Sequence, residues 1–277
     1  NQSLALKKRA YRGRELLEVK SISVSYKSND KGILFKRASF EAVSDVSFNI
    51  NKGERLGLVG ESGCGKSTLT RTILGLQSLK SGYINFDGKK ISNSDDSFKK
   101  NVQVVFQDPY GSFNPRHKIG RLIAESFFAL GELAPPQTEQ RIIVEEMLEE
   151  VGLPLESTEK YIHEFSGGQR QRIAIARALV TKPKLIIFDE AVSALDVSIK
   201  SQILKLISDL TERHNLSYLF ISHDLNVIEN ITEKCLVMKS GKIVERGPTK
   251  QILCAPKNEY TLSLINAAPK FPDFLHA

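Results

Sequence analysis

The spacing of hydrophobic and polar residues changes several times along this chain, and each pattern predicts an element. Residues 16–26 and 40–50 alternate apolar and polar side chains, which predicts two half-exposed antiparallel strands. Short continuous apolar runs, typical of buried strands, occupy residues 55–59, 102–106, 185–190 and 218–222. Apolar residues at helical spacing occupy residues 69–74, 170–179 and 197–214. Together these elements predict an α/β fold.

The remaining segments are more varied. Residues 82–88 read as a strand bounded by turn residues, and residues 236–245 as a closing hairpin. Residues 120–165 have a helical pattern that is interrupted at 131–138, where Pro135 and Pro136 follow one another. We therefore expect a separate helical lobe made of two helices. Residues 260–265 form a short amphipathic segment before a proline-containing tail.

A glycine-rich turn joins the predicted strand 55–59 to the helix that follows it. Its residues fit the pattern G-x-x-x-x-G-K-[ST]: Gly60, Glu61, Ser62, Gly63, Cys64, Gly65, Lys66, Ser67 and Thr68. Such a turn points backbone N–H groups at a phosphate beside a helix N-terminus. Lys66 then reaches the β- and γ-phosphates, and Ser67 binds Mg²⁺. The alternative is a glycine turn with a surface lysine, and the strand and helix on either side make it the weaker interpretation.

Polar residues follow three of the buried strands. Gln107 follows residues 102–106, Asp189 and Glu190 end the run 185–190, and His223 follows residues 218–222. Adjacent carboxylates on an extended chain point to opposite sides, so we expect Asp189 to hold Mg²⁺ and Glu190 to activate water. The simpler alternative is that these acids cap the next helix. A lone histidine is usually structural, but we expect the strand before His223 to lie beside the Glu190 strand, which favours a γ-phosphate contact.

A second polar turn precedes the helix 170–179. It contains Ser166, Gly168 and Gln169 and predicts another anion site at a helix N-terminus. An ordinary N-cap would explain Ser166 alone, whereas two glycines just inside a helix are costly and indicate a close backbone approach. Tyr26 ends the first predicted strand, where its ring could stack on a base or simply pack in the protein.

Composition narrows the class of protein. The chain has 277 residues, of which 41% are hydrophobic, so it can form a large core. It has no apolar run of about 18 residues and no signal-peptide pattern, which predicts a cytosolic chain. The formal charge is +7, but basic residues are interspersed with acidic ones, so we expect no nucleic-acid partner. Cys64, Cys235 and Cys254 have no metal-ligand spacing and no paired framework, which fits a reduced compartment.

Taken together, these motifs resemble the ATP-binding cassette of ABC transporters over residues 16–244. Residues 60–68 resemble the Walker A turn, Gln107 the Q-loop and residues 165–169 the signature. Residues 185–190 resemble the Walker B strand, 193–196 the D-loop and His223 the switch histidine. The resemblance implies a P-loop NTPase (RecA-like) core with an antiparallel β subdomain and an inserted helical subdomain.

The same resemblance implies domain boundaries and site residues. Residues 1–15 form a basic lead-in, 16–111 and 166–248 the ATP-binding core with its antiparallel β subdomain, 112–165 the helical subdomain and 249–277 a C-terminal tail. ATP and Mg²⁺ are the implied cofactors, with Tyr26 stacking on adenine and Gln107 joining Ser67 and Asp189 at the metal. Catalysis is assigned to Lys66, Gln107, Glu190 and His223. Ser166, Gly168, Gln169 and Asp196 complete the nucleotide site across a head-to-tail dimer.

A closer similarity is to the ATPases of oligopeptide, dipeptide and nickel importers, and especially to the second ATPase of such a pair. It rests on the insert 31–37, residues 105–109 with 112–116, and the tail 259–269, where Glu259-Tyr260-Thr261 departs from the usual His-Pro-Tyr-Thr. The implied partners are two membrane-spanning permease subunits, a second ABC ATPase and, indirectly, an extracytoplasmic solute-binding protein. The implied location is the cytoplasmic face of the inner membrane.

Several alternatives stay open from the sequence. Peptide import is favoured over import of nickel or other solutes by similarity alone. The chain begins with Asn1 rather than Met, so it is a separate subunit that has been trimmed or the second half of a fused importer of the YejF type. The other class of function is a soluble ABC ATPase in translation or DNA repair, which the importer-type tail disfavours.

Overall fold

The computed structural model describes residues 14–27, 39–91 and 96–268. Most of the basic lead-in, the insert 31–37 and the last residues of the tail lie outside the described residues. The chain divides into two compact units, one containing residues 1–95 and 220–271 and the other residues 96–219 and 272–277. The domain boundaries inferred from the sequence follow the motifs instead, and they stay a prediction.

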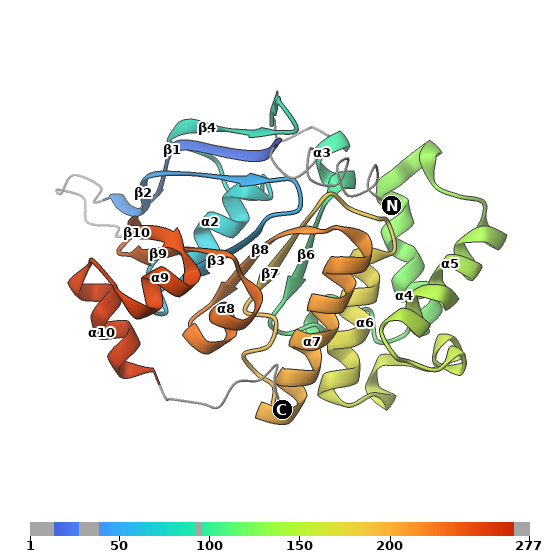
Figure 1. The fold of residues 1–277 in the computed structure, drawn as a ribbon. Coiled ribbons are helices and arrows are strands. Elements are labelled where there is room, and N and C mark those ends of the chain that lie inside the picture. The colour runs from blue at the N-terminus through green and yellow to red at the C-terminus, as the bar shows by residue number, and fades with distance from the viewer. Residues whose placement is uncertain (1–13, 28–38, 92–95, 269–277) are drawn as a thin grey trace, which may run out of the picture. The chain divides into compact units, whose positions relative to one another are not determined.

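The first unit contains the antiparallel sheet expected near the N-terminus. Its strands are ordered β2 (Ser39–Asn51), β1 (Glu15–Lys27), β4 (Ser81–Phe86) and β5 (Lys89–Lys90), and each pairs antiparallel with its neighbour (Figure 1). The alternation in β1 changes phase, because Val19, Ile22 and Val24 are all buried. A register shift between Val19 and Ile22 explains this, with Ser21 in a left-handed conformation at φ 46°.

The rest of the first unit supports the glycine turn. Strand β3 (Arg55–Val59) pairs in parallel with β9 (Lys234–Lys239), and β9 forms the expected hairpin with β10 (Lys242–Pro248). The helices of this unit are α2 (Lys66–Ile73), α8 (Leu225–Ile231), α9 (Thr249–Cys254) and α10 (Glu259–Ala267). Strand β8 (Ser217–Ser222) is continuous across the boundary between the units.

The second unit combines two parallel strands with helices. Strand β6 (Val102–Phe106) pairs in parallel with β7 (Leu185–Asp189). Strand β7 is buried over its first four residues, as expected, whereas β6 is buried only at Val102 and Val105 and ends in the exposed Phe106. The long helices α6 (Gly167–Leu179) and α7 (Val197–His214) are present as expected. Helix α3 (Asp96–Asn101) precedes β6 and was not expected.

The helical lobe in this unit is less regular than its sequence pattern suggests. It comprises α4 (Ile119–Ala124), the 3₁₀ segment η2 (Glu125–Leu133) and α5 (Gln137–Glu150), followed by the 3₁₀ turns η3 (Leu155–Glu159) and η4 (Ile162–Glu164). The expected interruption occurs at Gly131, with φ 57° and ψ −126°, before Pro135 and Pro136. None of the helices within the described ranges has the length and hydrophobicity of a membrane-spanning segment.

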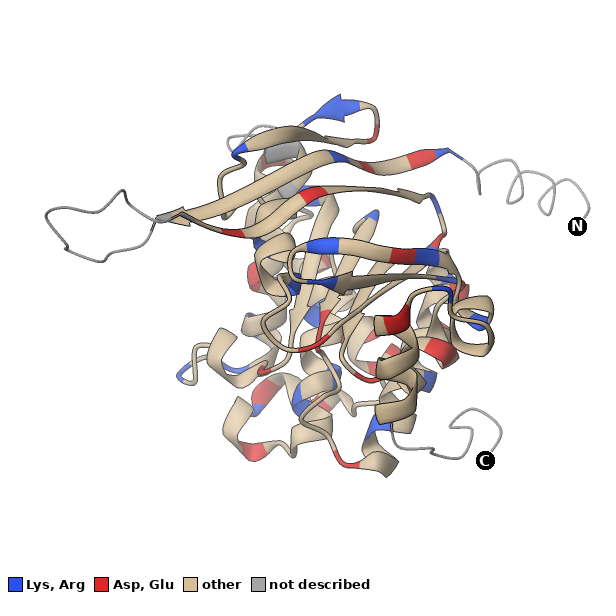
Figure 2. Cartoon of the chain, turned by 90° about the vertical axis from the view of Figure 1, so that its left-hand side faces the viewer, with Lys and Arg blue, Asp and Glu red and all other residues tan. Residues whose placement is uncertain are grey.

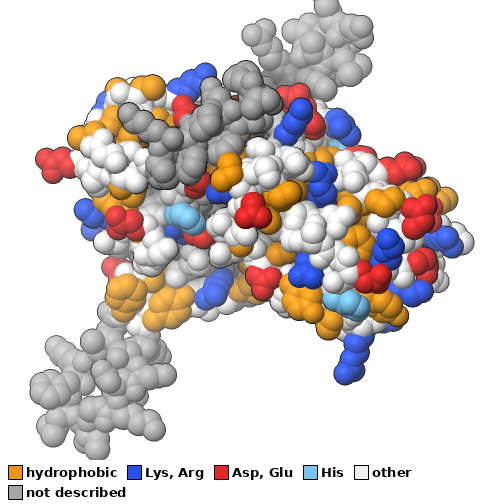
Figure 3. All heavy atoms as spheres, turned by 90° about the horizontal axis from the view of Figure 1, so that it is seen from below, with side chains coloured by type: hydrophobic (Ala, Val, Ile, Leu, Met, Phe, Trp, Pro, Cys, Tyr) orange, Lys and Arg blue, Asp and Glu red, His pale blue; other side chains and the backbone are white. Residues whose placement is uncertain are grey.

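The surface of each unit carries both signs of charge. Lysine and arginine residues are interspersed with acidic residues along the described strands and helices (Figure 2). Apolar side chains on the face drawn in Figure 3 occur in small groups among polar ones. Among the residues that the structure describes, the most exposed large apolar side chain is Phe128 of the helical lobe, at 84%. Basic and acidic residues are thus mixed on the surface, as they are along the sequence.

Candidate functional site

The glycine turn forms a helix N-terminus suited to an anion. Strand β3 is buried over its last four residues, and helix α2 begins at Lys66, directly after the turn. The N-cap is Gly65, at φ 113° and ψ 0°, and no side chain caps this helix. A helix normally needs partners for its first N–H groups. The start of α2, with the positive end of its helix dipole, therefore suits a phosphate.

Two glycines of the turn are required by close backbone contacts. A Cβ atom on Gly60 would lie 2.3 Å from the carbonyl oxygen of Met238, which belongs to β9. A Cβ atom on Gly65 would lie 2.4 Å from the carbonyl oxygen of Ala42 in β2. Because backbone atoms cannot move aside as a side chain can, both positions exclude any larger residue. The turn is thus fitted between β2 and β9.

Lys66 lies inside the turn. Its side chain is buried, with the residue 5% exposed. Its Nζ donates hydrogen bonds to the carbonyl oxygens of Gly60 at 2.7 Å and Glu61 at 2.9 Å. Burial raises the pKa of the neighbouring Cys64 thiol, which therefore stays protonated beside the ammonium group. Ser67, the predicted metal ligand, is exposed at the start of α2.

Tyr26 lies beside the same helix. Its hydroxyl group is 3.3 Å from the Oγ1 atom of Thr68, and the residue is 37% exposed. The structure therefore brings together two sequence-predicted residues that lie 42 positions apart. The ring is partly exposed and lies next to the glycine turn 60–68, which we also call the phosphate turn. This position favours stacking on a base over simple packing in the protein.

His223 also belongs to the first unit and follows β8 directly. The residues around it form a turn that starts α8. Ser222 Oγ accepts a hydrogen bond from the backbone N–H of Asp224 at 2.9 Å, and Asp224 caps α8 by accepting one from Asn226. His223 is exposed and lies between Ser222 and Asp224. The local structure thus holds the histidine backbone while leaving the ring at the surface.

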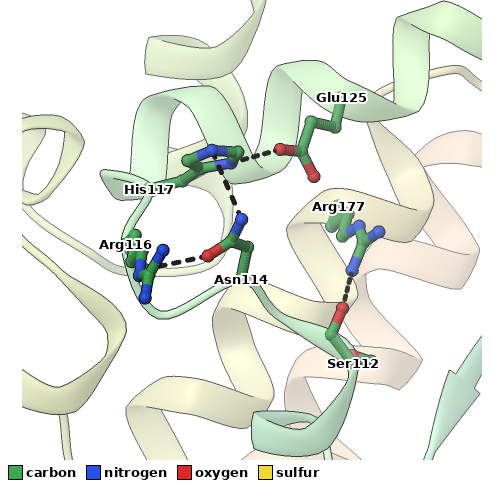
Figure 4. A network of polar contacts seen from close by, with 6 residues as sticks. All are labelled: Ser112, Asn114, Arg116, His117, Glu125 and Arg177. Atoms are coloured by element: carbon green, nitrogen blue, oxygen red, sulfur yellow. Dashed lines mark hydrogen bonds and ion pairs between the residues drawn. The ribbon is translucent and has the colours of Figure 1, made fainter.

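In the second unit, Gln107 is exposed directly after β6. The segment after it is held by a polar network (Figure 4). Asn114 accepts a hydrogen bond from the backbone N–H of Arg116 at 3.1 Å, and His117 Nδ1 is 2.6 Å from the Glu125 carboxylate. Arg177 of α6 donates to the carbonyl oxygen of Ser112 at 3.0 Å. This network ties the Gln107 segment to α4, η2 and α6.

The second polar turn carries a side-chain cap. Ser166 is the N-cap of α6, and its Oγ accepts a hydrogen bond from the backbone N–H of Gln169 at 3.4 Å. The Gln169 side chain accepts one from the Ser166 N–H at 3.0 Å, completing a capping box. A Cβ atom on Gly168 would lie 2.6 Å from Cγ2 of Ile199 in α7. Packing against α7 therefore supplies the close approach that the glycines indicated.

The two carboxylates after β7 differ in backbone conformation. Asp189 is the last residue of the strand, whereas Glu190 lies beyond it in a left-handed conformation at φ 52°. The expectation of an extended chain through both residues is therefore wrong at Glu190. A tight turn explains the difference, since Ser193 donates to the Glu190 carbonyl oxygen from its N–H and from its hydroxyl group at 2.8 Å. Left-handed non-glycine residues are strained and concentrate at functional sites.

The last predicted residue, Asp196, is the N-cap position of α7. Each unit thus carries part of the predicted set. The first unit contains Tyr26, the turn 60–68 and His223, and the second contains Gln107, Asp189, Glu190, Asp196 and the turn 166–169. Sequence reasoning missed Tyr260 of α10, whose hydroxyl group accepts a hydrogen bond from the backbone N–H of Glu61 at 3.1 Å. The only signal in the sequence was its place in the tail motif.

Comparisons with known proteins identify the family. Residues 43–193 match the family described as ABC transporter. The dipeptide transport ATP-binding protein DppF of Haemophilus influenzae is 43% identical over 244 residues, which are 87% of this chain and 74% of that protein. The oligopeptide transport ATP-binding protein OppF of Bacillus subtilis is 44% identical over 264 residues, which are 94% and 84% of the two chains. The chain belongs to the ABC transporter family.

A solved structure agrees with this assignment. The dimeric post-hydrolysis structure of the ATP-binding cassette MJ0796, bound to ADP and Pi, aligns with a TM-score of 0.72 and 27% identity, covering 84% of this chain and 99% of that one. The predicted fold, an ABC ATPase cassette, is confirmed, as is the prediction of an ATPase. The ABC transporter relatives are transport ATP-binding proteins, which also confirms the prediction of a transport ATPase over a soluble ABC ATPase in translation or DNA repair.

Proposed function

We propose that this chain is the ATP-hydrolysing subunit of a peptide importer. The observation that carries the proposal is the 43–44% identity to dipeptide and oligopeptide transport ATP-binding proteins over most of the chain. The domain boundaries inferred from the sequence belong to this proposal. The ATP-binding core supplies hydrolysis, and the helical subdomain 112–165 contacts the membrane subunits.

ATP binds at the turn 60–68, with adenine stacked on Tyr26. The uncapped N-terminus of α2 and the contact between Tyr26 and Thr68 support this placement. Lys66 turns from the carbonyl oxygens of Gly60 and Glu61 to the β- and γ-phosphates. In this structure these carbonyl groups keep the buried ammonium group hydrogen-bonded.

Three oxygen-bearing side chains are assigned to Mg²⁺. They are the Ser67 hydroxyl, the Gln107 amide and the Asp189 carboxylate, and Mg²⁺ prefers such oxygen ligands. The exposure of Ser67 at the start of α2 and the position of Asp189 at the end of β7 suit this role. When bound, the ion neutralises charge on the phosphates.

Glu190 accepts a proton from the attacking water, and His223 contacts the γ-phosphate. A positioned general base of this kind contributes roughly 10²- to 10⁴-fold to the rate. The turn that Ser193 closes on the Glu190 carbonyl group fixes the Glu190 backbone, so its carboxylate starts from a defined position. The exposed ring of His223, between two capped positions, supports its assignment.

The active form is a dimer with a second ABC ATPase. Ser166, Gly168, Gln169 and Asp196 of one cassette complete the nucleotide site of the other. The dimeric MJ0796 cassette supports this arrangement by similarity. ATP then joins the two cassettes, and hydrolysis releases them.

The remaining partners are two permease subunits in the membrane and, through them, an extracytoplasmic solute-binding protein. The cassette then lies at the cytoplasmic face of the membrane. Peptides are the proposed cargo because the relatives are named for dipeptide and oligopeptide transport. The exposed apolar side chains of the helical lobe, Phe128 and Leu133 among them, offer contact area for a membrane partner.

The variant Glu190→Gln tests this proposal. It keeps the shape of the side chain but cannot take a proton, so we expect ATP binding within about threefold of wild type and a turnover rate reduced roughly 10²- to 10⁴-fold. Fluorescent-nucleotide titration and phosphate release measure the two quantities, and light scattering with ATP and Mg²⁺ measures the expected stable dimer. Glu229→Gln, at an exposed position on α8, is the matched control. Normal turnover by Glu190→Gln rules out the assigned base.

A further inference from the structure

The C-terminal helix α10 reaches the phosphate turn through one side chain. Tyr260 is 7% exposed, and its hydroxyl group accepts the backbone N–H of Glu61, 199 positions earlier in the chain. Glu61 is the second residue of the turn. Neither the tail nor the turn needs this contact to form its own local structure.

The position of Tyr260 is fixed from its own side. The Asn258 side chain caps α10 by accepting the Tyr260 N–H at 2.9 Å. The Glu245 carboxylate of β10 accepts the N–H groups of Lys257 and Asn258 at 2.8 and 3.2 Å. Lys239 Nζ lies 4.6 Å from the centre of the Tyr260 ring, within cation–π distance. The hydroxyl group is therefore presented to Glu61 by an anchored side chain.

The hairpin next to α10 holds the same turn. The N–H of Gly241, between β9 and β10, donates to the carbonyl oxygen of Cys64 at 2.8 Å. The Met238 carbonyl group of β9 packs against Gly60. Hairpin and helix together form a support behind the turn, and Tyr260 is the part of it that bonds the Glu61 N–H.

The Gly60–Glu61 peptide has different partners with and without nucleotide. In this structure its carbonyl oxygen, that of Gly60, accepts from Lys66 at 2.7 Å, while its N–H, that of Glu61, donates to Tyr260. When Lys66 turns to the phosphates, the peptide loses the ammonium contact and keeps the Tyr260 contact. The hydrogen bond that Tyr260 accepts from the Glu61 N–H then contributes more to the geometry of the nucleotide-bound turn than to that of the turn in which Lys66 bonds the carbonyl groups. A turn that already has the phosphate-binding conformation also loses less binding free energy to the ordering of its backbone.

We propose that Tyr260 is a positioning residue for the phosphate turn, through which helix α10 sets the affinity for ATP. This inference rests on the proposed binding of ATP at residues 60–68. Tyr260 does not touch the phosphates, and it acts only through the Glu61 peptide. Any partner that pulls α10 away from the turn then weakens ATP binding.

The variant Tyr260→Phe tests the inference in the full chain. It keeps the ring beneath Lys239 and removes only the hydroxyl acceptor. We expect the Kd and KM for ATP to rise roughly 3- to 10-fold, the range for one lost hydrogen bond, with kcat within about twofold. The matched control is Tyr83→Phe, which removes a hydroxyl group that bonds Glu18 in the antiparallel sheet. That control is expected to keep the wild-type Kd, KM and kcat.

A second measurement does not need nucleotide. Hydrogen exchange of the peptide containing residues 60–65 is expected to be faster in Tyr260→Phe than in wild type, and unchanged in Tyr83→Phe. Faster exchange together with weaker ATP binding supports the inference. A variant that melts at a lower temperature but keeps the wild-type Kd and KM has lost only a structural contact, and this overturns it. If wild type itself binds no ATP, the proposed function fails as well, and the two failures are thereby distinguished.

Discussion

The phosphate turn of the first unit and the signature turn of the second both bring glycines to a helix N-terminus, but they satisfy that terminus differently. Helix α2 starts at a left-handed glycine with no side-chain cap, and Lys66 bonds the carbonyl groups of its own turn. Helix α6 starts at Ser166, which forms a reciprocal capping box with Gln169. The start of α2 thus has no side-chain cap, whereas the start of α6 is capped by its own side chains.

The supports of the two turns differ as well. The phosphate turn is held by backbone groups of β2 and β9 and by Tyr260, so its glycines face atoms that cannot yield. The signature glycine Gly168 faces the Ile199 side chain, which can shift. The phosphate turn thus contacts fixed backbone groups, whereas Ser166 must give up a cap to act on a phosphate. Three predictions follow this contrast.

The largest effect is expected for Lys66→Ala. This change removes the charge that we propose binds the phosphates, so ATPase activity is expected to fall by roughly 10²- to 10³-fold, as for the loss of one preorganised electrostatic contact. Phosphate release and nucleotide titration measure it. Lys90→Ala, which removes an exposed lysine from β5 of the same unit, is expected to keep normal activity. Equal losses in both variants contradict a specific role for the turn.

A smaller effect separates the two kinds of glycine. Gly65→Ala combines a left-handed backbone with a Cβ atom 2.4 Å from the Ala42 carbonyl oxygen, and is expected to cost about 2–3 kcal/mol or more in the free energy of unfolding. Gly168→Ala gains helix propensity while displacing Ile199, so a net cost of about 0–2 kcal/mol is expected.

Chemical denaturation of both variants, followed by circular dichroism, measures these costs. Gly167→Ala is the control for Gly168→Ala, because a Cβ atom on Gly167 would meet only Leu195, at 3.9 Å. A greater loss of unfolding free energy in Gly168→Ala than in Gly65→Ala contradicts the expectation that the backbone contacts of Gly65 yield less than the side-chain contact of Gly168.

The smallest effect concerns the support behind the phosphate turn. Burial acts to raise the pKa of Glu245, but the nearby Thr261 side chain, the hydrogen bonds from the N–H groups of Lys257 and Asn258 and the positive charge of Lys257 outweigh it, and the pKa is lowered. A lowered folded-state pKa means that the charged form stabilises the native protein. This contribution is complete above the ordinary pKa of 4.5 and is lost as pH falls through the lowered value.

The melting temperature of Glu245→Gln is therefore expected to be below that of wild type at pH 7. The gap is expected to close as the pH falls well below 4.5. Glu132→Gln, at an exposed position in the helical lobe, is expected to show no such gap. A difference from wild type that does not change with pH contradicts a stabilising role for the charged carboxylate.

The strands, turn and helix around the candidate site can be predicted from the sequence. The spacing of residues 60–68 predicted a strand, a turn and a helix, and β3 and α2 occupy those positions. The apolar runs before Gln107 and Asp189 correspond to β6 and β7. These features are readable because backbone conformation and burial within one element depend on residues close in the chain. Helices α3 and α8 were missed because each has too few turns for a clear period.

The contacts that hold these motifs in place come from residues far away in the chain. The bulge at Ser21, the left-handed turn at Glu190 and the contact of Tyr26 with Thr68 depend on partners that no local pattern specifies. The hydrogen bond between Tyr260 and Glu61 joins residues 199 positions apart, and it exists because β10 and the Asn258 cap place α10 beside the turn. Periodicity reports which side chains are buried. It does not report which distant backbone group each one meets.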